Sequence, residues 1–109
     1  MGSTHMTRKQ ALQALLDKIV AGQPVYNDDL LHVALPDIWL RVFDILSRKS
    51  LDAARSLHEA VRPGEIWMVW KLEDGEYGCN LVDSDTAFAR DPAVAWLIAL
   101  ITGEIERCE

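Results

Sequence analysis

The chain has 109 residues, half of them hydrophobic and 26% charged, which suits one folded domain and is too short for two independent cores. Its 17 acidic residues outnumber the 11 basic ones and give a net charge of −6. This charge opposes direct binding to nucleic acid, because such binding relies on Lys and Arg side chains that neutralise phosphates.

Residues 1–5 are typical of a cloning remnant, so we expect a single domain over residues 6–109. Within it, residues 7–22 predict an amphipathic helix that starts with Thr7 as its N-cap and ends just before Gly22. Residues 27–36 predict a short second helix, with Asn27 as a cap and Pro36 as a stop.

Two further helices are expected in the middle of the chain. Residues 38–46 carry apolar side chains on a wide helical stripe, although their β-branched and aromatic content leaves a strand possible. Ser50 has the side chain of an N-cap, and the residues after it predict a helix over 51–61. The sequence Arg62-Pro63-Gly64 ends that helix.

Residues 64–83, GEIWMVWKLEDGEYGCNLVD, predict a β-hairpin with strands at 66–72 and 76–82. An Asp74-Gly75 turn of two residues sets the expected register. It pairs Leu72 with Tyr77, Trp70 with Cys79, and Met68 with Leu81.

In that register, the three pairs and Ile66 form one apolar face of the hairpin. The other face carries Trp67, Val69 and Val82, so it is apolar as well near its base. A sheet with one face in water would alternate more cleanly. Either helices of the same chain or another molecule should therefore cover the second face.

The last helix is expected to begin at Asp91 as a cap, with Pro92 in its first turn. Its apolar residues spread around the helix cylinder, which is typical of a helix contacted from several sides. Residues 86–90 allow a short third strand.

The stretches LLDKIVAG, SLDAARSL, a Trp-bearing hairpin and DPAVAWLIALI follow one another in an order that resembles the phage α/β/α sandwich domain family. The resemblance spans nearly all of residues 7–103. It departs from the family in the inserted segment 39–47 and at Asp91, where the family often has Thr. It implies an α+β fold in which about four helices and a small antiparallel sheet form an α/β/α sandwich, with helices on both sheet faces. It supplies no catalytic residues.

Three small groups of residues could carry chemistry, and each has a simpler structural interpretation. Cys79 with His58 could act as nucleophile and base, but no third residue is suggested to orient them, and a buried strand cysteine and a helix histidine are the favoured interpretation. The segment 83–85 could bind a cation, yet it lacks the further ligands of a calcium loop. Asp28 and His32 could begin a metal site, but four-residue spacing usually gives a modest contact within a helix. We therefore expect no enzyme activity, no metal and no cofactor.

The candidate partner-binding residues lie on aromatic and acidic surfaces. Trp67, Val69 and Trp39 are either covered by the protein's own helices or serve as binding anchors. The acidic residues near the hairpin are either a solvated face or a surface that steers towards a basic partner. They are Glu73, Asp74, Glu76, Asp83 and Asp85.

These observations predict a non-catalytic phage or prophage protein that binds a host or phage protein with a basic surface. The resemblance, size and acidity suggest an inhibitor of a host defence or nucleic-acid-processing machine, such as an anti-CRISPR factor. The alternative is a phage structural or self-assembling module with a homodimer seam at Trp39 or at Trp67 and Val69. No apolar run approaches the roughly 20 residues that cross a bilayer. We expect no membrane partner and a cytoplasmic location.

Overall fold

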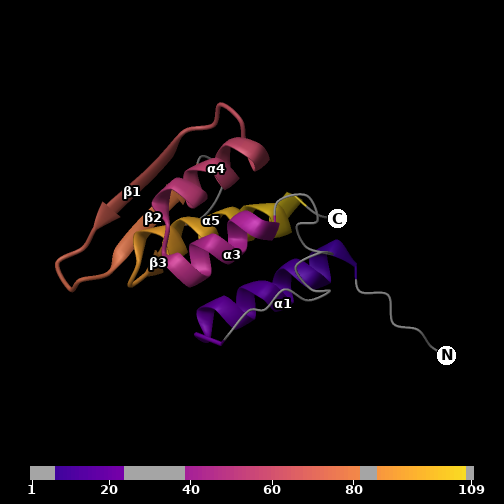
Figure 1. Cartoon of the computed structure of the whole chain (residues 1–109), viewed down its shortest axis with the longest axis horizontal. Coiled ribbons are helices and arrows are strands. Elements are labelled where there is room, and N and C mark those ends of the chain that lie inside the picture. The colour runs from indigo at the N-terminus through magenta and orange to yellow at the C-terminus, as the bar shows by residue number, and fades with distance from the viewer. Residues whose placement is uncertain (1–6, 24–38, 82–85, 108–109) are drawn as a thin grey trace.

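The computed structural model describes residues 7–23, 39–81 and 86–107, without the side chains of Trp39, Leu40 and Phe43 (Figure 1). It has an α+β fold, which confirms the expected class: helices packed with a small antiparallel sheet built on the hairpin. The elements are α1 (Arg8–Val20), α3 (Trp39–Arg48), α4 (Leu51–Val61), β1 (Trp67–Lys71), β2 (Tyr77–Leu81), β3 (Ala87–Ala89) and α5 (Pro92–Arg107). The helix expected at 27–36 lies outside the described residues.

The helix ends follow the capping residues expected from the sequence. Thr7 Oγ1 accepts a hydrogen bond from the Gln10 backbone N–H at 3.1 Å, and the Gln10 side chain accepts one from the Thr7 N–H. Ser50 and Asp91 likewise accept hydrogen bonds from the first turns of α4 and α5. Gly22, with φ of 73°, follows the end of α1 in the left-handed conformation.

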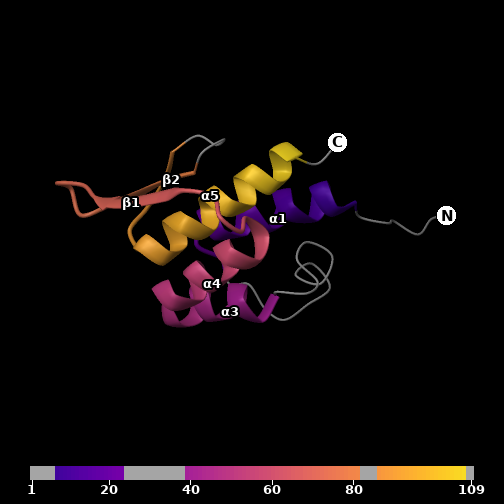
Figure 2. The same cartoon turned by 90° about the horizontal axis from the view of Figure 1, so that it is seen from above.

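Helix α5 lies at the centre of the molecule, as its all-round apolar pattern predicts. One face of the sheet packs against α5, and α1, α3 and α4 contact α5 from its other sides (Figure 2). Its seven fully or nearly fully buried apolar residues form the middle of the core: Ala93, Ala95, Trp96, Leu97, Ala99, Leu100 and Ile101. No helix in the described parts of the chain is long and apolar enough to cross a membrane.

The three strands form an antiparallel sheet in the order β1-β2-β3, and the third strand is the one that residues 86–90 allowed. The predicted hairpin register is wrong by one residue. The observed pairs place Trp67 opposite Leu81, Val69 opposite Cys79, and Lys71 opposite Tyr77.

The loop at the hairpin tip explains the shift. The Leu72 N–H donates to the Glu76 carbonyl at 2.7 Å, so three residues rather than two connect the strands. Gly75 has φ of 91° and its N–H donates to the Leu72 carbonyl, as in a turn that ends with a left-handed residue. The Asp74 carboxylate accepts from the Glu76 N–H at 3.0 Å and holds this longer loop.

A slip of one residue exchanges the two faces of a strand. Trp67 and Val69 therefore share the inner face of the sheet with the buried residues Cys79 and Leu81. Met68 lies on the outer face and is 57% exposed, and Phe88 of β3 is 51% exposed. The resemblance implied helices on both faces, but the described helices lie on the α5 side only (Figure 2).

A buried arginine joins the far ends of α4 and α5. The Arg62 side chain is 1% exposed and lies 3.5 Å from Glu104 and 3.4 Å from Glu65. Arg8 of α1 pairs with Glu104 at 3.1 Å, and Arg107 pairs with Glu65 at 3.2 Å. This network connects three helices at the end of the molecule where α1 begins and α5 ends.

Candidate functional site

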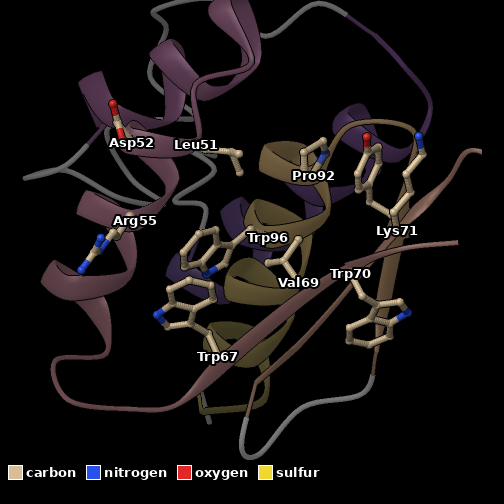
Figure 3. Close-up of a pocket in the computed structure, with 10 residues that line it drawn as sticks. Leu51, Asp52, Arg55, Trp67, Val69, Trp70, Lys71, Pro92 and Trp96 are labelled. Atoms are coloured by element: carbon tan, nitrogen blue, oxygen red, sulfur yellow. The ribbon is translucent and has the colours of Figure 1, made fainter.

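A groove with a volume of about 530 Å³ runs between β1, α4 and the first turns of α5 (Figure 3). It exists because α5 packs mainly against β2 and β3 and leaves part of the inner face of β1 open. Leu51 and Arg55 line it from α4, Trp67, Val69 and Lys71 from β1, and Trp96 from α5. The groove thus combines an apolar floor with charged ends.

Two stacked tryptophans form the floor. The rings of Trp67 and Trp96 have centroids 4.2 Å apart and planes inclined by 35°. Trp96 is 2% exposed, whereas Trp67 is 38% exposed and presents part of its indole to the groove. Since one ring is buried in the core and supports the other, Trp67 is held in place before any ligand arrives.

His58 of α4 fixes the buried ring from behind. Trp96 Nε1 donates to His58 Nδ1 at 3.3 Å, and His58 Nε2 donates to the Glu65 carbonyl at 2.9 Å. This pair of contacts requires a neutral imidazole with its proton on Nε2, because a carbonyl can only accept. The histidine is therefore fully occupied in holding α4, the segment before β1, and α5 together.

The groove has a cation at each end. Figure 3 shows Arg55 on the α4 side and Lys71 towards the far end of β1, with Trp67, Trp96 and Val69 between them. Both cations are exposed, and neither forms an ion pair with any residue that the structure describes. Asp52 adds one carboxylate near Arg55. The local charge is thus positive in a chain whose net charge is −6.

β1 is also an edge strand, and its outer edge pairs with no other strand in the described part of the chain. Hydrogen-bonded and non-hydrogen-bonded pairs alternate along an antiparallel ladder. Because Leu72 donates to Glu76, the bonded pairs continue at Trp70 and Met68. The backbone N–H and C=O groups of Trp67, Val69 and Lys71 consequently point to the free edge.

The structure brings together only some of the predicted partner-binding residues. Trp67 and Val69 meet in the groove. Glu73 and Asp74 are exposed and Glu76 is half-buried at the hairpin tip, beyond the Lys71 end of β1. The side chain of Trp39 lies outside the described residues, and so do Asp83 and Asp85.

Sequence reasoning missed the contributions of Trp96, Leu51, Arg55 and Lys71. In the sequence, Trp96 is one of the apolar residues that spread around the last helix, and nothing there connects it with the hairpin. The stacking contact between Trp67 and Trp96 could have revealed the groove. Predicting that contact from the sequence requires the correct hairpin register. A three-residue loop ending in Gly75 would have placed Trp67 on the inner face.

The surroundings of Cys79 do not support a role as a nucleophile with His58 as its base. Burial raises the pKa of the Cys79 thiol to about 12, so it is protonated at neutral pH and is a poor nucleophile. His58, the imagined base, uses both ring nitrogens for other contacts. Asp28, His32 and the segment 83–85 fall outside the described residues. Within the described ranges, no group of three or more His, Cys, Asp or Glu side chains is arranged to hold a metal ion.

Comparisons with known proteins found no match to a family model, a curated protein or a solved structure. The resemblance to the phage family therefore stays a prediction. A function for this chain has to be inferred from its groove and its strand edge.

Proposed function

We propose that this chain is a non-catalytic protein-binding module and that its contact surface is the groove together with β1. The observation that carries this proposal is the partly exposed Trp67, stacked on the buried Trp96 beside a strand edge that no other described strand pairs with. Aromatic anchors in well-packed pockets supply most of the energy of many protein interfaces.

The rigidity of the floor favours binding. A side chain that is mobile before association loses rotamer freedom on binding, which costs roughly 0.5–1.5 kcal/mol. Trp67 avoids much of this loss, because Trp96 supports its ring and His58 holds Trp96 in turn. Leu51, which is 47% exposed, extends the apolar surface onto α4.

The finer proposal is that the partner belongs to a host defence or nucleic-acid-processing machine. It is supported by the resemblance to the phage family and by the acidic character of the chain. Exposed carboxylates of Glu73 and Asp74 lie beyond the groove, where they would meet Lys or Arg side chains of a partner that extends past Lys71. Such charges would mainly raise the association rate and make it depend on salt.

An affinity pull-down with quantitative mass spectrometry tests the protein-binding function. The immobilised wild-type chain is compared with Trp67→Ala and with Phe88→Ala, which removes an exposed aromatic ring from the opposite face of the same sheet. Specific partners should be retained by the wild type and by Phe88→Ala, and lost with Trp67→Ala. Partners that survive Trp67→Ala and disappear with Phe88→Ala would place the interface on the outer face instead.

A second candidate function is self-assembly into a homodimer. It is favoured because the open edges of two β1 strands could pair symmetrically. Antiparallel pairing of two β1 edges about Val69 would place Trp67 of one copy opposite Lys71 of the other. Such a pair can form a cation–π contact across the strands. The six outward backbone groups of each strand would then pair with those of its twin.

Light scattering decides whether this dimer forms. A mass that rises from monomer to dimer with concentration, and stays monomeric for Trp67→Lys, would support the second candidate. Trp67→Lys would place an ammonium group opposite Lys71 of the other copy, and like charges opposite each other oppose pairing. A constant monomer mass for the wild type up to millimolar concentration would exclude it and leave the heterologous partner.

A further inference from the structure

We propose that the groove accepts an extended segment of a partner protein, which adds to β1 as a fourth strand and places a carboxylate side chain against Lys71. This inference rests on the proposed protein-binding function and specifies the chemistry of the partner. It follows from the backbone of β1, from the apolar floor of the groove, and from the charge at its ends.

The backbone of β1 supplies the first argument. The N–H and C=O groups of Trp67, Val69 and Lys71 point to the free edge and find no strand partner among the described residues. An added strand would satisfy these six groups with main-chain hydrogen bonds, as in other complexes that extend a sheet at its edge. This mode of binding requires an extended backbone but no particular side chains.

The side chains lining the groove supply the second argument. Alternate residues of an added strand would continue the inner face of the sheet and enter the space between β1 and α4. Beside Trp67 and Val69 this space is apolar and is closed on the α4 side by Leu51. Branched or aromatic side chains at two alternate positions of the incoming segment would therefore be buried there.

The charge of Lys71 supplies the third argument. It identifies the kind of side chain expected at the next inward-facing position of the added strand. Lys71 belongs to the inner face, together with Trp67 and Val69. A strand beside β1 would bring its own inward side chain next to this ammonium group. Because no described carboxylate pairs with Lys71, an incoming Asp or Glu would supply the missing countercharge.

An inward lysine on an edge strand, with no carboxylate beside it in the described ranges, also discourages indiscriminate pairing, because an apolar segment would have to cover the charge without neutralising it. The same residue would thus reject apolar strands and select acidic ones. Arg55 at the other end of the groove has Asp52 nearby, so its preference is less sharply defined. Lys71 is therefore the residue to test.

The experiment uses a fluorescein-labelled six-residue peptide with Val, Val and Glu at alternate positions and Thr at the others, titrated with the full chain. Fluorescence anisotropy should show saturable binding, with a dissociation constant on the order of 100 μM for so short a strand. Replacing Glu by Lys in the peptide should weaken binding about tenfold, which corresponds to about 1.4 kcal/mol. The Lys71→Glu variant should reverse that preference.

Two N-methylated peptides test the backbone mode. Methyl groups on one set of alternate amides would block hydrogen bonds to β1, whereas methyl groups on the other set would face solvent. Methyl groups on the amides that face β1 should abolish binding, whereas methyl groups on the amides that face solvent should leave binding intact. Binding that tolerates both sets would overturn strand addition, and an unchanged peptide preference in Lys71→Glu would overturn the carboxylate contact.

No saturable binding of any peptide at millimolar concentration would overturn the inference altogether. In that case the pull-down with Trp67→Ala would still decide the broader protein-binding function. A Trp67→Ala variant that binds the peptide as tightly as the wild type would show that the peptide sits elsewhere. Circular dichroism of each variant confirms that it is folded before its affinity is compared.

Discussion

The indole of Trp70 lies across Gly78, its cross-strand partner on the outer face of the sheet. A Cβ atom at position 78 would lie 2.6 Å from Trp70 Cε2 and Cζ2, which is closer than carbon atoms can pack. The glycine therefore provides the space that the large ring occupies. This relationship also identifies the register, because Trp70 faces Gly78 only if three residues form the hairpin loop.

Gly78→Ala should lower the free energy of unfolding by about 1–2 kcal/mol, since the new methyl group would force Trp70 out of its position. Urea denaturation measures the change. In a Trp70→Ala background the same substitution should cost less than about 0.5 kcal/mol, because the ring that it displaces is gone. Equal costs in both backgrounds would show that Trp70 does not rest on this glycine.

Engineered cysteines can test the register directly. Val69 and Cys79 are directly opposite and form a non-hydrogen-bonded pair, in which the side chains of antiparallel strands are closest. A Val69→Cys variant should form an intramolecular disulfide with Cys79 under mild oxidation, as seen by mass spectrometry. The matched Trp70→Cys variant should not. The opposite result would restore the two-residue loop and would place Val69 on the outer face.

The helices could be predicted from the sequence because their signals are local. Thr7, Ser50 and Asp91 cap the helices that follow them, and Gly22 ends α1. The hairpin register depends instead on a choice between two loops of nearly equal length, both compatible with Asp74-Gly75. That choice depends on small energy differences in the tip, and it decides which side chains reach the core.

The pKa of Cys79 leads to a pH prediction. Because burial raises the pKa of the thiol to about 12 in the folded chain, the thiol stays protonated at pH values where the same thiol in the unfolded chain ionises, near its ordinary pKa of 9.0. Its contribution to stability is complete below pH 9 and is lost as the pH rises towards 12. The stability of the wild type should therefore fall more steeply over this range than that of Cys79→Ala.

Alkylation provides a second measurement on the same residue. In a Cys108→Ser background, iodoacetamide at pH 8 should label Cys79 slowly in the folded protein and rapidly in urea. The comparison measures the labelling rate of the same thiol in the folded and in the unfolded state of the same chain. Rapid labelling of the folded protein would contradict the burial of the thiol and would reopen a reactive role for it.

The buried Arg62 should matter more for stability than its exposed neighbour in the same network. Arg62→Met would leave Glu104 without its buried partner, and we expect a loss of about 3 kcal/mol. Arg107→Ala removes a cation whose side chain is 48% exposed, and should cost less than about 1 kcal/mol. Thermal denaturation of both variants measures the contrast, and equal losses would contradict it.

Gly103 of α5 lies against the Arg62 side chain, so a substitution there also tests how tightly this arginine is packed. A Cβ atom at this position would overlap the Arg62 guanidinium. Alanine normally stabilises a helix interior relative to glycine, by roughly 1 kcal/mol. Gly103→Ala should nevertheless destabilise this protein in urea denaturation, because the guanidinium would be displaced from Glu104. A gain in stability would show that Arg62 has room elsewhere.

The candidate site was only partly predictable, because it is made of long-range contacts. Trp67 and Val69 stood out in the sequence as apolar residues without an assigned place. Their neighbours Arg55 and Trp96 come from helices on either side of the hairpin in the sequence. No local pattern indicates that α5 covers β2 and β3 while leaving β1 partly open.

Amide hydrogen exchange followed by NMR tests most directly whether β1 and its groove form the binding surface. In the free protein, the amides of Trp67, Val69 and Lys71 should exchange quickly, whereas those of Met68 and Trp70, which face β2, should be protected. Adding the acidic peptide or a purified partner should slow exchange at the first three residues. Unchanged exchange there, with new protection on the outer face around Phe88 or at the hairpin tip, would contradict the account.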